Sequence, residues 1–403
     1  MKRNLSVTFI VITVVLDAMG IGLILPVMPD LLMEVRNADV SNAAIWGGLL
    51  SATFAIMQFL FSPSIGNLSD RFGRRPVLLV STAVMAIDYV VMALAGSIWL
   101  LLVGRTIGGI TAATNATANA FMADISTPEK KAQNFGLIGA AFGIGFVIGP
   151  AVGGFLGEYG SRAPFYAAAI LAALNFVFGY FILPETVTDE NRRPFEWTRA
   201  NPLGAFKYIA ALPGLSALMI VYFFYQVSNM VYPAIWAYYT QVNFGWSPQL
   251  VGISLAIYGI SIAITQVFLI RLIIARLGEW RAVWWGLIYN AFTLSLMAVI
   301  SNGWVLLLLT PMAAFGAIVA PALQSVMSQR ADNNQQGELQ GVLSSINSIG
   351  MIGAPILFTQ TFAYFTSRDA VLFLPGGAFL LACAIMIVAW MVFAAAKTTE
   401  NAP

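Results

Sequence analysis

The sequence predicts an all-α membrane protein with twelve transmembrane helices in two pseudo-symmetric six-helix bundles. Its 403 residues are 59% hydrophobic and only 9% charged, whereas an ordinary soluble domain is about 25% charged. Twelve apolar runs have the length of about 17 to 25 residues that a helix needs to cross a bilayer. A weak internal repeat at an offset of 205 residues indicates that one bundle is a duplicate of the other.

The apolar runs give the expected order of helices along the chain. We expect spans at 6–29, 44–65, 76–96, 98–122, 134–157, 163–183, 209–240, 248–270, 282–301, 303–328, 339–364 and 370–395. The long polar stretch 184–207 separates the sixth run from the seventh. The predicted domains are therefore an N-terminal six-helix bundle at 1–183, a cytoplasmic linker at 184–207 and a C-terminal six-helix bundle at 208–403.

The internal repeat is visible at matched residues of the two halves. The pairs are Arg71 with Arg276, Gly73 with Gly278, Met122 with Met327, Gly136 with Gly341, and Pro150 with Pro355. A duplicated helical bundle of this kind places its ligand site between the halves, near the middle of the membrane.

The distribution of Lys and Arg predicts the orientation of the chain in the membrane. If the N-terminus is inside, most cations fall on the inner side, and Arg36, Arg162 and Arg368 alone fall outside. Inner loops carry the excess of cations in membrane proteins. We therefore expect both termini in the cytoplasm.

Composition excludes several kinds of chemistry. The formal charge of +2 is too small for a protein that binds nucleic acid by bulk electrostatics. There is no histidine, and Cys383 is the single cysteine, so a zinc site or a histidine-based catalytic triad has no ligands or base. We expect no enzyme activity, no catalytic residues, no metal and no cofactor. Proton chemistry must then fall to carboxylates.

The loop between the second and third spans carries a dense motif, Gly66-Asn-Leu-Ser-Asp70-Arg71-Phe-Gly73-Arg74-Arg75-Pro76. One interpretation is a short inner loop that follows the cation bias, with glycine for the turn. The other is a conformational latch formed by Gly66, Asp70, Arg71, Gly73, Arg74 and Asp124. In that latch Asp70 caps a helix N-terminus of the other half, and Arg74 pairs with Asp124 at the end of the fourth span.

These residues resemble the loop signature of the major facilitator superfamily. The fifth span contains Gly145, Gly149, Pro150, Gly153 and Gly154 at the spacing of the motif that marks the drug/proton antiporter branch. The segment Leu16–Pro26 is similar to the first helix of the tetracycline/proton antiporters. The resemblance implies twelve helices and proton-driven export. The glycines also have a simpler interpretation, because small residues at four-residue spacing let membrane helices pack closely.

Three ionisable residues lie well inside predicted spans, namely Asp17, Asp88 and Arg105. A charge at the centre of a bilayer costs about 2.5 to 3.5 kcal/mol on insertion scales. We therefore expect Asp17 to take up and release the coupling proton or to contact substrate, and Arg105 to sense or relay its state. Asp17 is alternatively a hydrogen-bonded structural acid, and Asp88 can equally pair with polar groups at a packing face.

The second half departs from the tetracycline exporters that it resembles. Those proteins carry an acid where Asn290 stands and a histidine where Ile262 stands. An asparagine keeps hydrogen bonding but cannot exchange a proton. The departure counts against a metal-chelated tetracycline as substrate and assigns proton coupling to the first half.

Neutral polar residues are the candidates for substrate binding. Several in the seventh span recur at three- and four-residue spacing and so share a helix face. An aromatic belt at the membrane interface, or hydrogen bonding between helices, would also explain such residues. The candidates are Gln58, Asn115, Asn119, Tyr222, Gln226, Asn229, Gln266, Asn290 and Gln324.

The expected function is proton-coupled efflux of a small amphipathic, drug-like compound by alternating access. Its partners are then the substrate, protons and the lipid bilayer, and we expect a multi-pass monomer in the bacterial inner membrane. Two alternatives stay open. The amide-rich second half also suits a carrier of a neutral metabolite or sugar-like solute, and a fold of this type can serve as a membrane ligand sensor.

Overall fold

The computed structural model describes residues 2–112, 114–187, 192, 215–332 and 335–400. At 2–5, 114–116, 128, 129, 131, 132 and 397–400 it describes the main chain only. Every regular element in this part of the chain is helical. The predicted linker at 184–207 lies outside the described residues except for 184–187 and 192, and so does the side chain of Asn115.

Contacts divide the chain into two compact units. Unit 1 comprises Met1–Ala38, Thr53–Pro202 and Ser247–Ala256, and unit 2 comprises Asp39–Ala52, Leu203–Trp246 and Ile257–Pro403. A short piece of each half of the sequence thus groups with the other unit, which the predicted domain limits of 183 and 208 do not anticipate. Those limits stay a prediction.

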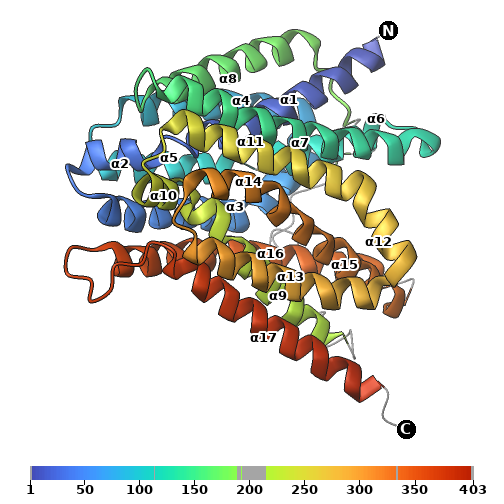
Figure 1. Cartoon of the computed structure of the whole chain (residues 1–403). Coiled ribbons are helices and arrows are strands. Elements are labelled where there is room, and N and C mark those ends of the chain that lie inside the picture. Colours follow the sequence, from blue (N-terminus) through green and yellow to red (C-terminus); the bar gives the residue numbers. More distant parts are fainter. Residues whose placement is uncertain (1, 113, 188–191, 193–214, 333–334, 401–403) are drawn as a thin grey trace. The chain divides into compact units, whose positions relative to one another are not determined.

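The helices are shown in Figure 1. Those of the first half are α1 (Lys2–Ile24), α2 (Met28–Arg36), α3 (Val40–Phe72), α4 (Arg74–Leu94), α5 (Ile98–Thr111), α6 (Thr114–Ile125), α7 (Pro128–Gly157) and α8 (Ala163–Ile182). Those of the second half are α9 (Ser216–Asn229), α10 (Val231–Phe244), α11 (Pro248–Ile264), the π-helical turn η2 (Thr265–Leu269), α12 (Ile270–Leu277), α13 (Glu279–Val299), α14 (Gly303–Ala313), the 3₁₀ turn η3 (Ala314–Ile318), α15 (Val319–Arg330), α16 (Gln336–Thr366) and α17 (Gly377–Glu400).

Most of these helices are long and apolar enough to cross a membrane. Eleven such spans occur in the described residues, and α5 is a shorter apolar helix. The predicted fourth span is divided between α5 and α6, and the seventh between α9 and α10. Phe181, Leu308 and Trp304 expose most of their surface, as side chains that face lipid do.

In unit 1, α1 is the central helix. It packs along α7 and α8, while α4 packs on α8 and α5 (Figure 1). Phe9, Ile10 and Val14 of α1 are buried against Phe121 of α6 and neighbouring apolar residues. Lipid tails are as apolar as these side chains. The contact is therefore stabilised by close van der Waals packing and not by the exclusion of water.

In unit 2, α17 packs on α9 and α13, and α16 packs on α9 and α10. Aromatic rings fill the space between α10 and α17. Tyr239 and Phe379 have ring centroids 4.9 Å apart, and the Tyr239 hydroxyl donates to the carbonyl oxygen of Met297 on α13. A buried tyrosine needs such an acceptor. Tyr239 therefore connects α10 to α13 through its hydrogen bond and to α17 through its ring contact.

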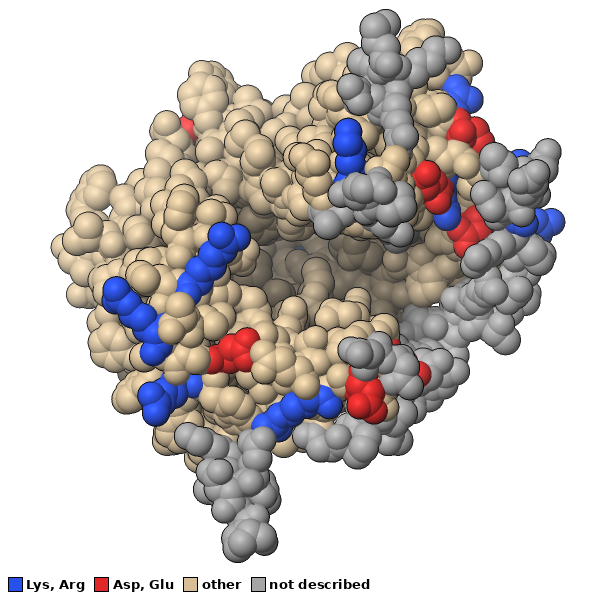
Figure 2. Space-filling model, turned by 90° about the vertical axis from the view of Figure 1, so that its right-hand side faces the viewer, with Lys and Arg blue, Asp and Glu red and all other residues tan. Residues whose placement is uncertain are grey.

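Cationic side chains lie at a joint between two successive helices in each unit. Arg71, Arg74 and Arg75 lie where α3 meets α4, and Arg276 and Arg281 lie where α12 meets α13. Figure 2 shows a face on which Lys, Arg, Asp and Glu side chains are numerous. The cation-rich loops are those that the sequence assigns to the inner side.

A salt bridge outside the spans joins α2 to the loop between α7 and α8 in unit 1. Glu34 accepts hydrogen bonds from Ser161 Oγ at 2.6 Å and from Arg162 Nε at 3.1 Å. Arg162 also donates to the carbonyl oxygen of Ala93 at the end of α4. The Ser161 hydroxyl first, and then Arg162, lower the pKa of the Glu34 carboxyl below its usual 4.5.

We expect this salt bridge to make stability depend on acid. Because the pKa is lower in the folded state, the contribution is complete above pH 4.5 and is lost as the pH falls through the folded value. Glu34 is half exposed, so the effect is small. Thermal unfolding in detergent should show a loss of stability as the pH falls below 4.5, and this loss should be smaller in Glu34→Gln. An equal loss in the variant would contradict the assignment.

Candidate functional site

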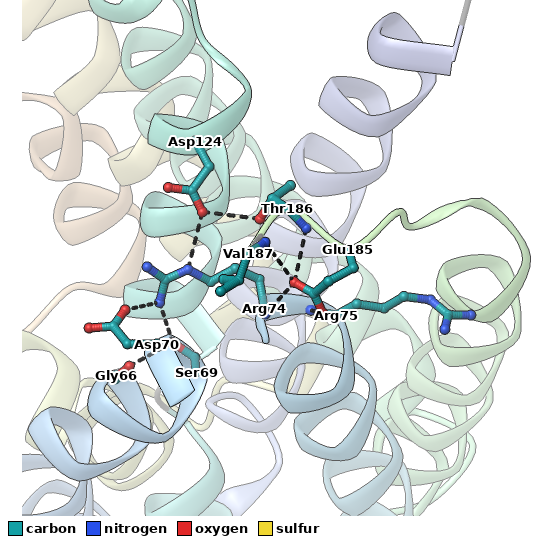
Figure 3. A network of polar contacts seen from close by, with 9 residues as sticks. All are labelled: Gly66, Ser69, Asp70, Arg74, Arg75, Asp124, Glu185, Thr186 and Val187. Carbon is teal, nitrogen blue, oxygen red and sulfur yellow. Dashed lines mark hydrogen bonds and ion pairs between the residues drawn. The ribbon is translucent and has the colours of Figure 1, made fainter. Parts of the chain in front are cut away.

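The predicted latch in unit 1 is a connected network of polar contacts (Figure 3). Arg74, the first residue of α4, lies 2.6 Å from Asp70 Oδ1 through Nη1 and 3.2 Å from Asp124 Oδ2 through Nε. Its Nη1 also donates to Ser69 Oγ, which in turn donates to the Gly66 carbonyl oxygen. One guanidinium therefore joins the end of α3, the start of α4 and the end of α6.

Glu185, which follows α8, completes the network. Its carboxylate accepts from the main-chain N–H groups of Arg74 at 2.8 Å and Arg75 at 3.3 Å. These are free N–H groups at the N-terminus of α4, where a negative charge is favourable. Gly73 has φ of +108°, and a side chain there would collide with the Glu185 carboxylate. The positive φ favours glycine at this position, and the absence of a side chain leaves room for the Glu185 carboxylate.

Most of the predicted latch residues come together here, with one exception. Arg71 places its guanidinium 5.1 Å from the Phe72 ring centroid and does not join the drawn network. Asp70 contacts Arg74, and its expected contact with a helix of the other half stays a prediction. Thr186 is not among the predicted latch residues, and its hydroxyl donates to Asp124 Oδ2 at 3.0 Å.

We expect Arg74→Ala to shift the balance between inward and outward access more than substrate affinity. Each pair at this exposed site contributes at most about 1 kcal/mol, which is about a fivefold change in an equilibrium. The measurement is the rate of thiol labelling at Gln58→Cys in a Cys383→Ala background. Arg71→Ala is the matched control, because it removes a neighbouring cation outside the network. Equal labelling rates in both variants would refute the latch.

The second half contains a counterpart of this joint. Gly278 has φ of +75° and precedes α13, as Gly73 precedes α4. At the offset of 205 residues Arg74 corresponds to Glu279, and Asp124 corresponds to Gln329. Gln329 Nε2 donates to the Glu279 carboxylate at 2.8 Å and 2.9 Å, and Ser325 Oγ donates to it at 2.6 Å. The geometry is repeated, but an ion pair has become a hydrogen bond between an amide and an anion.

The three ionisable residues inside the spans lie in unit 1. Asp17 and Asp88 are 8% and 6% exposed, and among the described residues neither Oδ1 atom has a hydrogen-bond partner. Asp88 lies against Gly104 and Gly108 of α5, and it interacts electrostatically with Arg105 on that helix. The Arg105 guanidinium lies 5.5 Å from the Phe54 ring centroid.

The glycine motif of α7 forms a seam along α1. Side chains at Gly145, Gly149 and Gly153 would collide with main-chain atoms of Val15, Met19 and Leu23 respectively. On another side of α7, Gly154 meets the main chain of Pro248, and Gly252 meets that of Pro150. Only glycine allows main chain to approach main chain so closely, so the motif fixes α7 against α1 and the start of α11.

The neutral polar candidates on α9 and α15 are hydrogen-bonded within unit 2. Gln324 Nε2 donates to the Tyr222 hydroxyl at 3.1 Å, and Gln226 Nε2 donates to Asn347 Oδ1 at 2.7 Å. Asn229 Nδ2 donates to the Tyr225 carbonyl oxygen one turn back on α9. These contacts connect α9 with α15 and α16. Gln266 is exposed within η2, a type of turn that is frequent at functional sites.

Asn290 is placed differently from the other candidates. It is 2% exposed, and its Nδ2 donates to the carbonyl oxygens of Gly286 and Gly316. The Tyr225 hydroxyl donates to the same Gly316 oxygen. Burial and complete use of its donors argue against direct contact with substrate. Asn290 holds the 3₁₀ turn η3 against α13.

Gln58 and Asn119 are the two candidates of unit 1 whose side chains the structure describes. Gln58 Nε2 makes a long contact of 3.5 Å with the Ala112 carbonyl oxygen after α5, and Asn119 is half-buried on α6. Among the described residues there is no group of three or more His, Cys, Asp or Glu side chains that would hold a metal ion.

Comparison with known proteins identifies the fold and the family. The model of the Major Facilitator Superfamily matches residues 10–355 and, in a second match, 218–403. The chain belongs to the major facilitator superfamily. The class C tetracycline resistance protein of Escherichia coli is 40% identical over 384 residues, covering 95% of this chain and 96% of that protein. The class B protein of Escherichia coli is 39% identical and covers 88% of each chain.

A solved structure supports the same superfamily fold. The crystal structure of the nucleoside transporter NupG matches with a TM-score of 0.79 and 16% identity over 98% of this chain and 99% of that one. The predicted fold class, twelve helices of a major facilitator protein, is confirmed. So is the resemblance to the drug/proton antiporters, and the chain is a multi-pass membrane protein.

Proposed function

We propose that this protein exports a small amphipathic, drug-like compound across the bacterial inner membrane, driven by inward proton movement. The observation that carries the proposal is Asp17. It is a buried acid in the middle of a membrane-spanning helix, with an oxygen that no described residue bonds. A carboxylate retained at such a cost is expected to be functional. The superfamily consists of transporters, so the protein is proposed to work as one and not as an enzyme.

The direction of transport and the kind of substrate follow from the relatives. Several proteins at about 40% identity over nearly the whole chain are named as tetracycline resistance proteins, which supports efflux. In the second half, Asn290 is held by main-chain oxygens, and its amide cannot exchange a proton. Proton coupling is therefore assigned to Asp17, Asp88 and Arg105 of unit 1, and the cation-rich loops are assigned to the cytoplasm together with both termini.

In this mechanism the proton and the substrate each bias the equilibrium between inward-open and outward-open states. Protonation of Asp17 removes a buried negative charge, so the free energies of the two states change by different amounts. The substrate must also bind the two states with different affinity, since otherwise it cannot couple to the proton. The Arg74 network is proposed to stabilise one of the two states, and the protein is proposed to act as a monomer.

The test is transport in everted membrane vesicles that contain the protein. A panel of tetracycline, other antibiotics, dyes and sugars is offered with and without a pH gradient. Uptake of at least one amphipathic compound should require an acidic lumen and should alkalinise that lumen in proportion, because protons leave as the compound enters. Uptake of a neutral solute that ignores the gradient would favour the carrier of neutral solutes, which the linked amides of unit 2 also suit. Binding without counterflow would favour a sensor.

A further inference from the structure

Tyr89 is a buried hydroxyl among the acidic residues of unit 1. It follows Asp88 on α4 and is 7% exposed. The nearest atom to a side chain built at Gly20 would be the Tyr89 Oη atom. Gly20 lies three residues after Asp17, so both occupy the same face of α1. The hydroxyl therefore lies against α1 within one turn of Asp17, in space that Gly20 leaves open.

The charges around Tyr89 do not cancel unless one proton is bound. Arg105 on α5 attracts the Asp88 carboxylate and offsets part of the cost of burying its charge. Among the described residues no cation acts on Asp17 in this way, and an ionised carboxylate buried without a partner is costly. Tyr89 interacts electrostatically with all three of these groups. Tyr89 is thus coupled electrostatically both to the acid on α1 and to Asp88 and Arg105.

Few other titratable groups occur on the helices packed around this cluster. The stretch of α7 from Gln133 to Gly157 has none. Those of the other helices are Asp70 and Arg71 at the end of α3, Arg105 on α5, Asp124 on α6 in the latch, and Tyr166 and Tyr180 near the ends of α8. Tyr89 is therefore the neutral donor available to Asp17 from α4.

We propose that the Tyr89 hydroxyl donates a hydrogen bond to the ionised Asp17 carboxylate and releases it when Asp17 takes up a proton. Tyr89 then turns toward the Asp88–Arg105 pair, so that proton loading on α1 is conveyed to α4 and α5. It is a positioning residue and does not itself lose its proton. This inference rests on the proposed function, because it gives Asp17 the coupling proton.

The test is the pH profile of gradient-driven drug transport in vesicles with Tyr89→Phe. A hydrogen bond to an ionised group favours that form, so its removal should move the midpoint of the profile upward by about one pH unit. Drug binding should stay within about twofold, since the ring and its packing remain. Tyr166→Phe, an exposed tyrosine of α8, is the matched control and should leave the profile unchanged.

Two further variants keep the inference falsifiable. Gly20→Ala retains the hydroxyl but displaces it from α1, and it should shift the profile in the same direction even if Tyr89→Phe does not accumulate. In a chain with Asp17→Asn, adding Tyr89→Phe should leave counterflow unchanged. Unchanged midpoints in both Tyr89→Phe and Gly20→Ala would overturn the role of Tyr89. If the unmodified protein shows no gradient-driven transport at all, the proposed function itself fails.

Discussion

Asp17→Asn is expected to abolish transport driven by the pH gradient while leaving substrate exchange in place. The amide has nearly the shape of the carboxyl and can hydrogen-bond, but it cannot bind or release a proton in this range. Gradient-driven uptake into everted vesicles should fall to the level of vesicles that lack the protein. Counterflow needs no net proton movement, so exchange of labelled for unlabelled drug should continue.

Asp369→Asn is the matched control, because Asp369 is an exposed acid outside the membrane-spanning helices. It should transport like the unmodified protein. Gradient-driven uptake that persists in Asp17→Asn would show that the coupling proton binds elsewhere. Loss of counterflow together with uptake would instead assign Asp17 to substrate binding, the alternative that the sequence also allows.

Gly153→Val is expected to have the largest effect on stability. A side chain at Gly153 would collide with the carbonyl oxygen of Leu23 on α1. Main chain cannot move aside as a flexible side chain can, so α1 and α7 must separate. Overpacking of this kind costs about 3 kcal/mol. The melting temperature in detergent and the amount of protein in the membrane should both fall.

Gly143→Val tests the same change on the same helix. A side chain at Gly143 meets nothing within 4 Å, so the variant carries the same change in helix propensity without the collision. It should melt close to the unmodified protein. Equal destabilisation in the two variants would mean that valine harms α7 itself and that the seam with α1 has no special part.

The sequence predicts the helices of this fold well because hydropathy over some twenty residues is a strong signal. It does not predict how they are divided. The break between α14 and α15 depends on Asn290 and Tyr225, which bond the Gly316 carbonyl oxygen from two other helices. A contact between residues so far apart in the chain leaves no local pattern.

Contacts between residues far apart in the chain also explain why some site residues were predicted and others were missed. The sequence predicts the pair of Arg74 and Asp124 because both lie at the inner ends of predicted spans, and their side chains lie 3.2 Å apart. Glu185 caps the same helix from 111 residues away, and its position at the start of a charged linker gave no sign of this. The position of Tyr89 directly after Asp88 is a sequence feature that pointed to the site. It was not decisive, because aromatic residues are common in membrane helices.

The repeated joint after Gly73 and Gly278 has a consequence for how the halves respond to ionic strength. Dissolved salt screens opposite charges that are partly exposed, and the contact between Arg74 and Asp124 is of that type. The contact between Glu279 and Gln329 has only one charged partner and is much less sensitive. The two halves therefore contain joints of similar geometry that differ in their response to salt. Added salt should weaken the Arg74–Asp124 contact in the first half and should change the Glu279–Gln329 contact in the second half much less.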